Sequence, residues 1–70
     1  MGDESKAEQK WKDFKRAVRK AWRKVDEQDL DEYRDSFEEI VDYVEETTGK
    51  ARRSVRKKVK KLARKIGIDF

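Results

Sequence analysis

Hydrophobic side chains recur every three or four residues along this chain, in three successive stretches. The first stretch runs from Trp11 to Val25, with spacings of three, four and seven residues. Because 3.6 residues complete one turn of an α-helix, these spacings place the hydrophobic side chains on one helical face. The pattern therefore predicts an amphipathic helix over residues 5–25, in which Ser5 and Glu8 form a capping box at the start.

The second stretch begins after a group of acidic residues. Asp26, Glu27 and Asp29 supply carboxylates where the N-terminus of a helix has unpaired N–H groups and the positive end of its dipole. The hydrophobic positions then continue to Gly49, a residue type that readily takes the left-handed conformation that ends a helix. We therefore predict a helix over residues 27–48.

A second capping sequence interrupts this middle block. The run Ser36-Phe37-Glu38-Glu39 is typical of a helix start, so a break near Asp35 would divide the block into two helices. The hydrophobic register continues through this point without a slip, which favours one continuous helix. Both alternatives stay open from the sequence.

The third stretch predicts a helix over residues 50–66, followed by Gly67 and by Ile68 and Phe70, which can fold back over its end. Helices joined by turns this short pack as antiparallel neighbours. The expected fold is all-α, a small antiparallel bundle of three helices, or of four if the middle helix is broken. A chain of 70 residues is expected to form a single helical domain over residues 1–70.

The predicted core consists of the hydrophobic residues on the shared helix faces. They are Trp11, Phe14, Val18, Trp22, Leu30, Tyr33, Phe37, Ile40, Val41, Val44, Val55, Val59, Leu62 and Ile66. Since both tryptophans follow the periodicity, we expect both to be buried. Tyr43 lies off this face, and we expect it to be partly exposed and to cover a seam between helices.

Missing residue types exclude several kinds of chemistry. The chain has no cysteine and no histidine, which removes disulfides, thiolate nucleophiles, imidazole metal ligands and the commonest general base. Asp29 and Asp31 begin like a calcium loop, but Arg34 and Ile40 stand where such a loop needs its glycine and its last glutamate. We expect a protein that is not an enzyme, with no cofactor, no metal site and no small-molecule substrate.

The sequence also favours a location. No hydrophobic run approaches the about 18 residues that cross a bilayer, and the N-terminal residues lack the apolar segment of a signal peptide. We expect a cytoplasmic, soluble monomer.

Charges are segregated along the chain. Residues 1–25 carry nine Lys or Arg and four acids, residues 26–49 carry one and eleven, and residues 50–66 carry ten and none. Like charges one turn apart destabilise an isolated helix. If the acidic helix lies between the two basic ones, opposite charges attract across both helix–helix contacts, and this attraction specifies which helices pack together. We expect Arg52 and Arg56, which flank the hydrophobic stripe of the last helix, to meet acidic residues.

The remaining cations of the last helix are the functional candidates. Five of them point away from its hydrophobic stripe: Arg53, Lys57, Lys61, Arg64 and Lys65. Such a patch can neutralise the phosphates of a nucleic acid or another polyanion, and no Asn, Gln or aromatic residue is interleaved with it to read bases.

Two alternatives to polyanion binding stay open. In the first, the cations are only a solvated counter-charge to the acidic helix, and the protein is a purely structural bundle, natural or engineered, with no ligand. In the second, the last helix binds an anionic membrane surface. That alternative is less favoured, because the helix would have to leave the bundle and has no aromatic anchor before Phe70.

One run of aromatic and basic residues is followed by a short acidic run, and together they form a specific pattern. They are Trp11-Lys12-x-Phe14-Lys15-x-x-Val18-x-x-x-Trp22-x-Lys24-Val25 and Asp29-Leu30-Asp31-Glu32. The arrangement resembles the bacterial CsbD-like stress-response family, across roughly residues 9–62. The resemblance implies a small all-α fold with the paired tryptophans in its core and expression linked to general stress, and no established molecular activity. The wholly basic last helix departs from that family, in which this helix is usually mixed or acidic.

Overall fold

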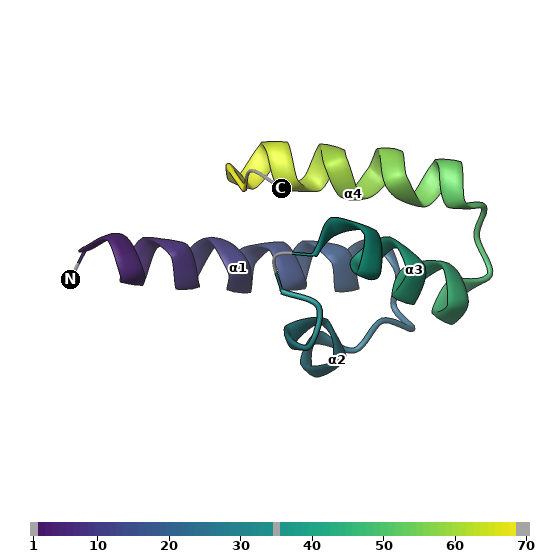
Figure 1. The fold of residues 1–70 in the computed structure, drawn as a ribbon, viewed down its shortest axis with the longest axis horizontal. Coiled ribbons are helices and arrows are strands. Elements are labelled where there is room, and N and C mark those ends of the chain that lie inside the picture. The colour runs from purple at the N-terminus through teal and green to yellow at the C-terminus, as the bar shows by residue number, and fades with distance from the viewer. Residues whose placement is uncertain (1, 35, 69–70) are drawn as a thin grey trace.

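Four α-helices make up the regular structure of the computed structural model, which describes residues 2–34 and 36–68, with side chains from Lys6 onward. They are α1 (Gly2–Ala21), α2 (Glu27–Asp31), α3 (Phe37–Thr48) and α4 (Arg52–Ile66). Figure 1 shows α4 along one edge of the molecule and α2 at the opposite edge, with α1 and α3 between them. The prediction of an all-α bundle is confirmed, in its four-helix form.

The last helix, α4, packs against both α1 and α3, and it runs antiparallel to each of them (Figure 1). α1 also packs against α2. The first and last helices are both basic, so their direct contact corrects the expectation that the acidic block lies between them. At this contact Lys10 Nζ donates to the carbonyl of Gly67 at 3.4 Å.

Hydrophobic burial explains why two basic helices lie together. Val55 and Val59 of α4 are fully buried. Burying a side chain of this kind stabilises the fold by about 1.5–3 kcal/mol. Repulsion between solvated like charges costs only about 0.2–0.5 kcal/mol per neighbouring pair. Packing therefore decides which helices touch, and the charges turn outward.

The helix boundaries differ from the predicted ones at both ends of α1, within the middle block, and at the start of α4, which begins at Arg52 instead of residue 50. α1 begins at Gly2, so Ser5 lies within the helix and not at its N-cap position, and α1 ends at Ala21 instead of residue 25. The middle block is two helices, since α2 ends at Asp31 and α3 begins at Phe37. Asp35, where the break was expected, lies outside the described residues.

The break lets two tyrosines meet. The ring centroids of Tyr33 and Tyr43 are 5.5 Å apart. In one continuous helix, ten residues would separate them by about 15 Å along the axis. Ser36 takes the N-cap position of α3, as its sequence indicates, but its side chain accepts no capping hydrogen bond from the described residues. The contact between the tyrosines therefore favours the break more than capping by Ser36 does.

Most of the predicted core is buried. Nine of its fourteen residues are buried: Trp11, Phe14, Val18, Leu30, Ile40, Val41, Val44, Val55 and Val59. The other five pack against this core and are partly buried: Trp22, Tyr33, Phe37, Leu62 and Ile66. Val25 and Ala63 complete the buried set. Trp22, which was predicted to be buried, is only partly buried, although its N–H still donates to the carbonyl of Val18 at 2.9 Å, as in a helix.

Trp11 joins α1 to α2. Its side chain is 5% exposed, its ring stacks on Phe14 at 5.6 Å, and its Nε1–H donates to Asp31 Oδ1 at 2.7 Å. A buried indole N–H requires such an acceptor. Lys15 Nζ donates to the same carboxylate oxygen at 2.7 Å. The hydrogen bonds from Lys15 and then Trp11 hold the pKa of Asp31 below its ordinary value.

Tyr43 joins α3 to the start of α2. Its hydroxyl donates to Asp29 Oδ2 at 2.9 Å and accepts from the N–H of Asp26 at 3.0 Å. Burial raises the pKa of Tyr43, so the hydroxyl keeps its proton for this bond. The expectation that Tyr43 is partly exposed and covers a seam is confirmed. Asp29 and Asp31, which begin like a calcium loop, are both used by these interhelical hydrogen bonds.

Gly67 ends α4 in the left-handed conformation, with φ of 94°. The N–H groups of Gly67 and Ile68 both donate to the carbonyl of Ala63 at 2.8 Å, a geometry that reverses the chain direction. Ile68 thereby folds back onto the core, as expected. Phe70 lies outside the described residues.

We predict that the two tryptophans differ both in exposure to solvent and in their contribution to the free energy of unfolding. In Trp22→Phe, the remaining Trp11 should emit at short wavelength and resist iodide quenching, whereas in Trp11→Phe the remaining Trp22 should be readily quenched. Trp11→Phe should also lower the free energy of unfolding by about 1–2 kcal/mol, because Asp31 loses a buried donor. Equal quenching of the two single-tryptophan proteins would contradict the burial described above.

A second prediction concerns acid. Because the pKa of Asp31 is lowered by folding, its stabilising contribution is present above the unfolded value of about 3.9 and is lost as pH falls through the folded value. Asp31→Asn should therefore show a smaller drop in melting temperature than the parent between about pH 6 and pH 3. Asp13→Asn is the matched control, since Asp13 accepts only from the Gln9 amide among the described residues. A drop in Asp31→Asn as large as that of the control would refute this role.

Candidate polyanion-binding surface

Two of the nine cations of α4 face α3. Arg52 Nη2 donates to Glu38 at 2.8 Å, and Arg52 Nη1 bonds Asp42 and lies 3.5 Å from Glu45. Arg56 Nη1 lies 3.0 Å from the other oxygen of Glu38. The hydrogen bonds to Asp42 and then Glu38 raise the pKa of Arg52. The expectation that Arg52 and Arg56 meet acidic residues is confirmed.

Five of the other seven cations of α4 share a solvent-exposed face and will be called the α4 cation cluster. Its members are Arg53, Lys57, Lys60, Lys61 and Arg64. All five are exposed, and none of them forms an ion pair with a described residue. Their charges are therefore not neutralised by α3 in the way that those of Arg52 and Arg56 are.

Four of the five predicted site residues belong to this cluster. Lys57, Lys61 and Arg64 line a hollow of about 540 Å³ near the end of α4, and Arg53 and Lys57 line a second hollow of about 400 Å³. Lys65, the fifth predicted residue, is exposed but lines neither hollow. The cluster therefore covers the predicted patch without Lys65.

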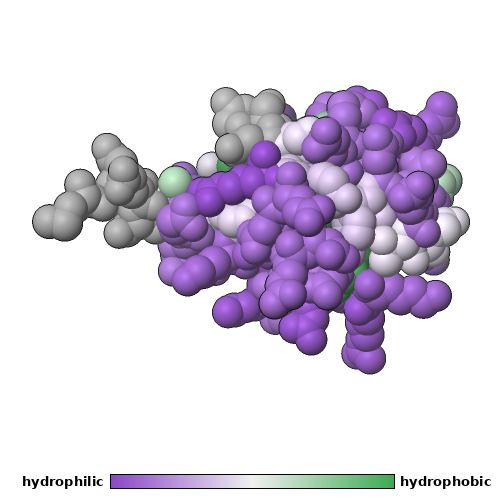
Figure 2. Space-filling model, turned by 60° about the horizontal axis from the view of Figure 1, so that its bottom comes forward, coloured by the Kyte–Doolittle hydropathy of each residue, from purple (hydrophilic) through white to green (hydrophobic). Residues whose placement is uncertain are grey.

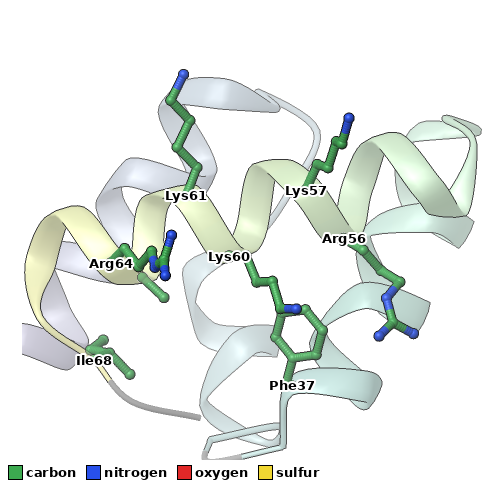
Figure 3. Close-up of a pocket in the computed structure, with 8 residues that line it drawn as sticks. Phe37, Arg56, Lys57, Lys60, Lys61, Arg64 and Ile68 are labelled. Atoms are coloured by element: carbon green, nitrogen blue, oxygen red, sulfur yellow. The ribbon is translucent and has the colours of Figure 1, made fainter.

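The larger hollow has an apolar floor. Phe37, Ala63 and Ile68 contribute hydrophobic side chains to it, and the cations surround them. Figure 3 shows Lys57 and Lys61 extending away from the bundle, whereas Arg56 lies toward Phe37 of α3. The Arg56 guanidinium carbon is 5.6 Å from the centroid of the Phe37 ring. α3 therefore brings one aromatic ring beside the basic face of α4, although no aromatic residue is interleaved with the five predicted cations in the sequence.

Two residues of this surface were not predicted. Lys60 lines both hollows, and its spacing of three and four residues from Lys57 and Arg64 already indicates the same helical face. Phe37 has no such signal. It lies 20 residues before Lys57 in the sequence and reaches the cluster only because α3 runs antiparallel to α4.

Within α4 the cluster is unfavourable. Arg53, Lys57 and Lys61 follow one another at four-residue spacing, as do Lys60 and Arg64. Each such pair costs about 0.2–0.5 kcal/mol in a helix. An anion bound across the cluster would relieve this repulsion, so the arrangement favours polyanions over cations or neutral ligands.

The visible surface elsewhere is also strongly polar. In the view of Figure 2, hydrophilic side chains form most of the described surface, paler residues of intermediate hydropathy lie among them, and hydrophobic ones show only as small spots. No described helix has both the length and the apolar character needed to cross a bilayer. Among residues with described side chains, no three acidic groups come together as a metal site would require. Charge is thus the property that this surface offers to a partner.

Comparisons of the chain with protein-family models, with curated proteins and with solved structures find no match. The resemblance to the CsbD-like family therefore stays a prediction that rests on the residues quoted for it.

We predict that adjacent arginines of α4 separate stability from binding. Arg52→Gln should lower the melting temperature at low salt, because three carboxylates of α3 lose their common partner. Arg53→Gln, the matched control one residue away, should leave it nearly unchanged. The difference should shrink in about 1 M salt, where such pairs are screened. Equal melting temperatures for the two variants at low salt would contradict the distinction between the paired Arg52 and the unpaired Arg53.

Proposed function

We propose that this protein binds polyanions such as nucleic acids through the α4 cation cluster, without sequence preference and without catalysis. One observation carries the proposal: the five exposed cations of the cluster have no anionic partner among the described residues, although α3 neutralises Arg52 and Arg56 on the same helix.

The dimensions of the cluster suit a phosphate backbone. From Arg53 to Arg64 the helix rises about 16 Å. This length corresponds to about five base pairs of a duplex, which carries one negative charge per about 1.7 Å of its axis. Several phosphates can therefore lie along α4 at once, and each contact releases condensed counterions.

The chemistry of the cluster favours contacts with phosphates over contacts with bases. Three of its five members are lysines, which act as flexible point charges and lack the planar fork with which arginine pairs to guanine. The floor residues Phe37, Ala63 and Ile68 have no polar side-chain atoms that could read a base edge. We therefore expect similar affinities for unrelated sequences.

The CsbD-like resemblance adds a biological setting to this proposal. It supports a small all-α protein whose expression is linked to general stress. It supplies no activity of its own, so the binding function rests on the α4 cation cluster alone.

A structural bundle without a ligand is the second candidate. The ion pairs of Arg52 and Arg56 favour it for those two residues, because there the basic helix does serve as counter-charge to the acidic one. The α4 cation cluster has no corresponding pairs with described residues, which is why we place binding first.

The decisive experiment is a fluorescence anisotropy titration with unrelated DNA and RNA duplexes at several salt concentrations. Three to five engaged cations predict a slope of roughly −3 to −5 in a plot of log affinity against log salt, since each neutralised phosphate contributes about 0.9. Lys57→Glu with Lys61→Glu should reduce the slope by about two and weaken binding to every sequence alike.

The matched control is Lys6→Glu with Lys12→Glu, which changes the net charge equally at exposed positions of α1 outside the cluster. The control should keep most of the slope. If both double variants bind alike, the α4 cation cluster is not the contact. If the parent binds no duplex at low salt, the structural bundle becomes the better account.

A further inference from the structure

A second group of unpaired cations lies at the end of α1. This α1 cation cluster consists of Arg16, Lys20, Arg23 and Lys24, all of them exposed. None of the four forms an ion pair with a described residue, whereas the neighbouring Arg19 pairs with Glu27 at 3.2 Å. The cluster lines two adjoining hollows of about 550 and 560 Å³.

The two clusters lie on different faces of the molecule. Both hollows of the α1 cation cluster are lined by Glu27 of α2 and by no residue of α4. α4 packs on another side of α1, where Ala21 and Val55 line a common hollow. Figure 1 shows α4 and α2 at opposite edges of the bundle with α1 between them. A polyanion on one cluster therefore leaves the other open.

Helix capping accounts for only part of the α1 cation cluster. Cations in the last turn of a helix interact favourably with its dipole, and Arg19 and Lys20 occupy that turn of α1. Arg16 precedes the last turn, and Arg23 and Lys24 follow the end of the helix. The positions of Arg16, Arg23 and Lys24 are thus explained neither by the helix dipole nor by an ion pair with a described residue.

We propose that one copy of this protein bridges two polyanion segments, one on the α4 cation cluster and one on the α1 cation cluster. This inference rests on the proposed function and adds a second binding face to it. The molecule measures 39 × 21 × 19 Å. Its shorter dimensions are about twice the Debye length of about 10 Å at 0.1 M salt. Phosphates held on separate faces are therefore largely screened from each other.

Bridging is tested with two unrelated duplexes, one fixed to beads and the other fluorescent and free. The parent protein should carry the fluorescent duplex onto the beads at low salt. Capture should pass through a maximum as protein is added and should fall when unlabelled duplex is in excess, because each copy then binds duplexes that are not on the beads. Anisotropy with a single duplex, measured in parallel, reports binding separately from bridging.

The test variant is Arg16→Glu with Arg23→Glu, and Lys6→Glu with Lys12→Glu again controls for net charge. Relative to this control, the test variant should bind a single duplex within about twofold but should lose capture by about tenfold or more, since only the second face is removed. Sedimentation of the free protein should show a monomer. That result would exclude bridging by pairs of copies.

The outcomes separate the two proposals. Binding of single duplexes without capture by the parent would overturn bridging and leave the proposed function standing. Undiminished capture by Arg16→Glu with Arg23→Glu, or a dimer that dissociates in that variant, would overturn the role of the α1 cation cluster. Failure of the parent to bind any duplex would remove the proposed function and the inference together.

Discussion

The structure depends on the burial of one narrow hydrophobic stripe on α4 against both α1 and α3. Val55 and Val59 lie fully inside the core, and α4 carries nine Lys or Arg and no acid that could balance them. Burial of the stripe brings this helix against another basic helix, so its charged side chains lie either beside α3 or in solvent. Those at the α3 edge meet carboxylates, and those on the far side face water. The distribution of charge on the surface is thus a consequence of packing.

Much of the fold follows from periodicity, and the exceptions have local causes. The spacing of hydrophobic residues correctly indicates the helices that contain Trp11, Ile40 and Val55 and predicts most of the buried set. Periodicity could not reveal that α1 ends at Ala21, because the residue after it continues the apolar pattern with no glycine or proline to mark the end. The periodicity also favoured one continuous middle helix. It did not show the break, because the break comes with a tertiary contact between Tyr33 and Tyr43, which leaves no trace in the local pattern of hydrophobic residues.

The sequence could predict the part of the candidate surface that α4 forms alone. It could not predict the part that forms where α3 meets α4. Helical spacing alone separates Arg52 and Arg56 from the outward cations, and it could also have identified Lys60. The apolar floor beneath the cations required the meeting of α3 and α4, which brings Phe37 beside residues far along the chain. The α1 cation cluster is visible in the sequence as a run of Lys and Arg. Its separation from α4 depends on α2 lying on the other side of α1.

The short helix α2 is held to the rest of the bundle by few contacts. It has five residues and buries only Leu30, so its attachment depends on side chains that reach it from elsewhere: the indole of Trp11 and the hydroxyl of Tyr43. Elements with few buried contacts open at a lower free energy than the rest of a domain. α2 is therefore expected to open at a lower free energy than the longer helices, which bury more side chains. Because Glu27 begins it and holds Arg19, detachment of α2 would release a further cation next to the α1 cation cluster. Local unfolding would then increase the positive charge of one face while the core stays intact.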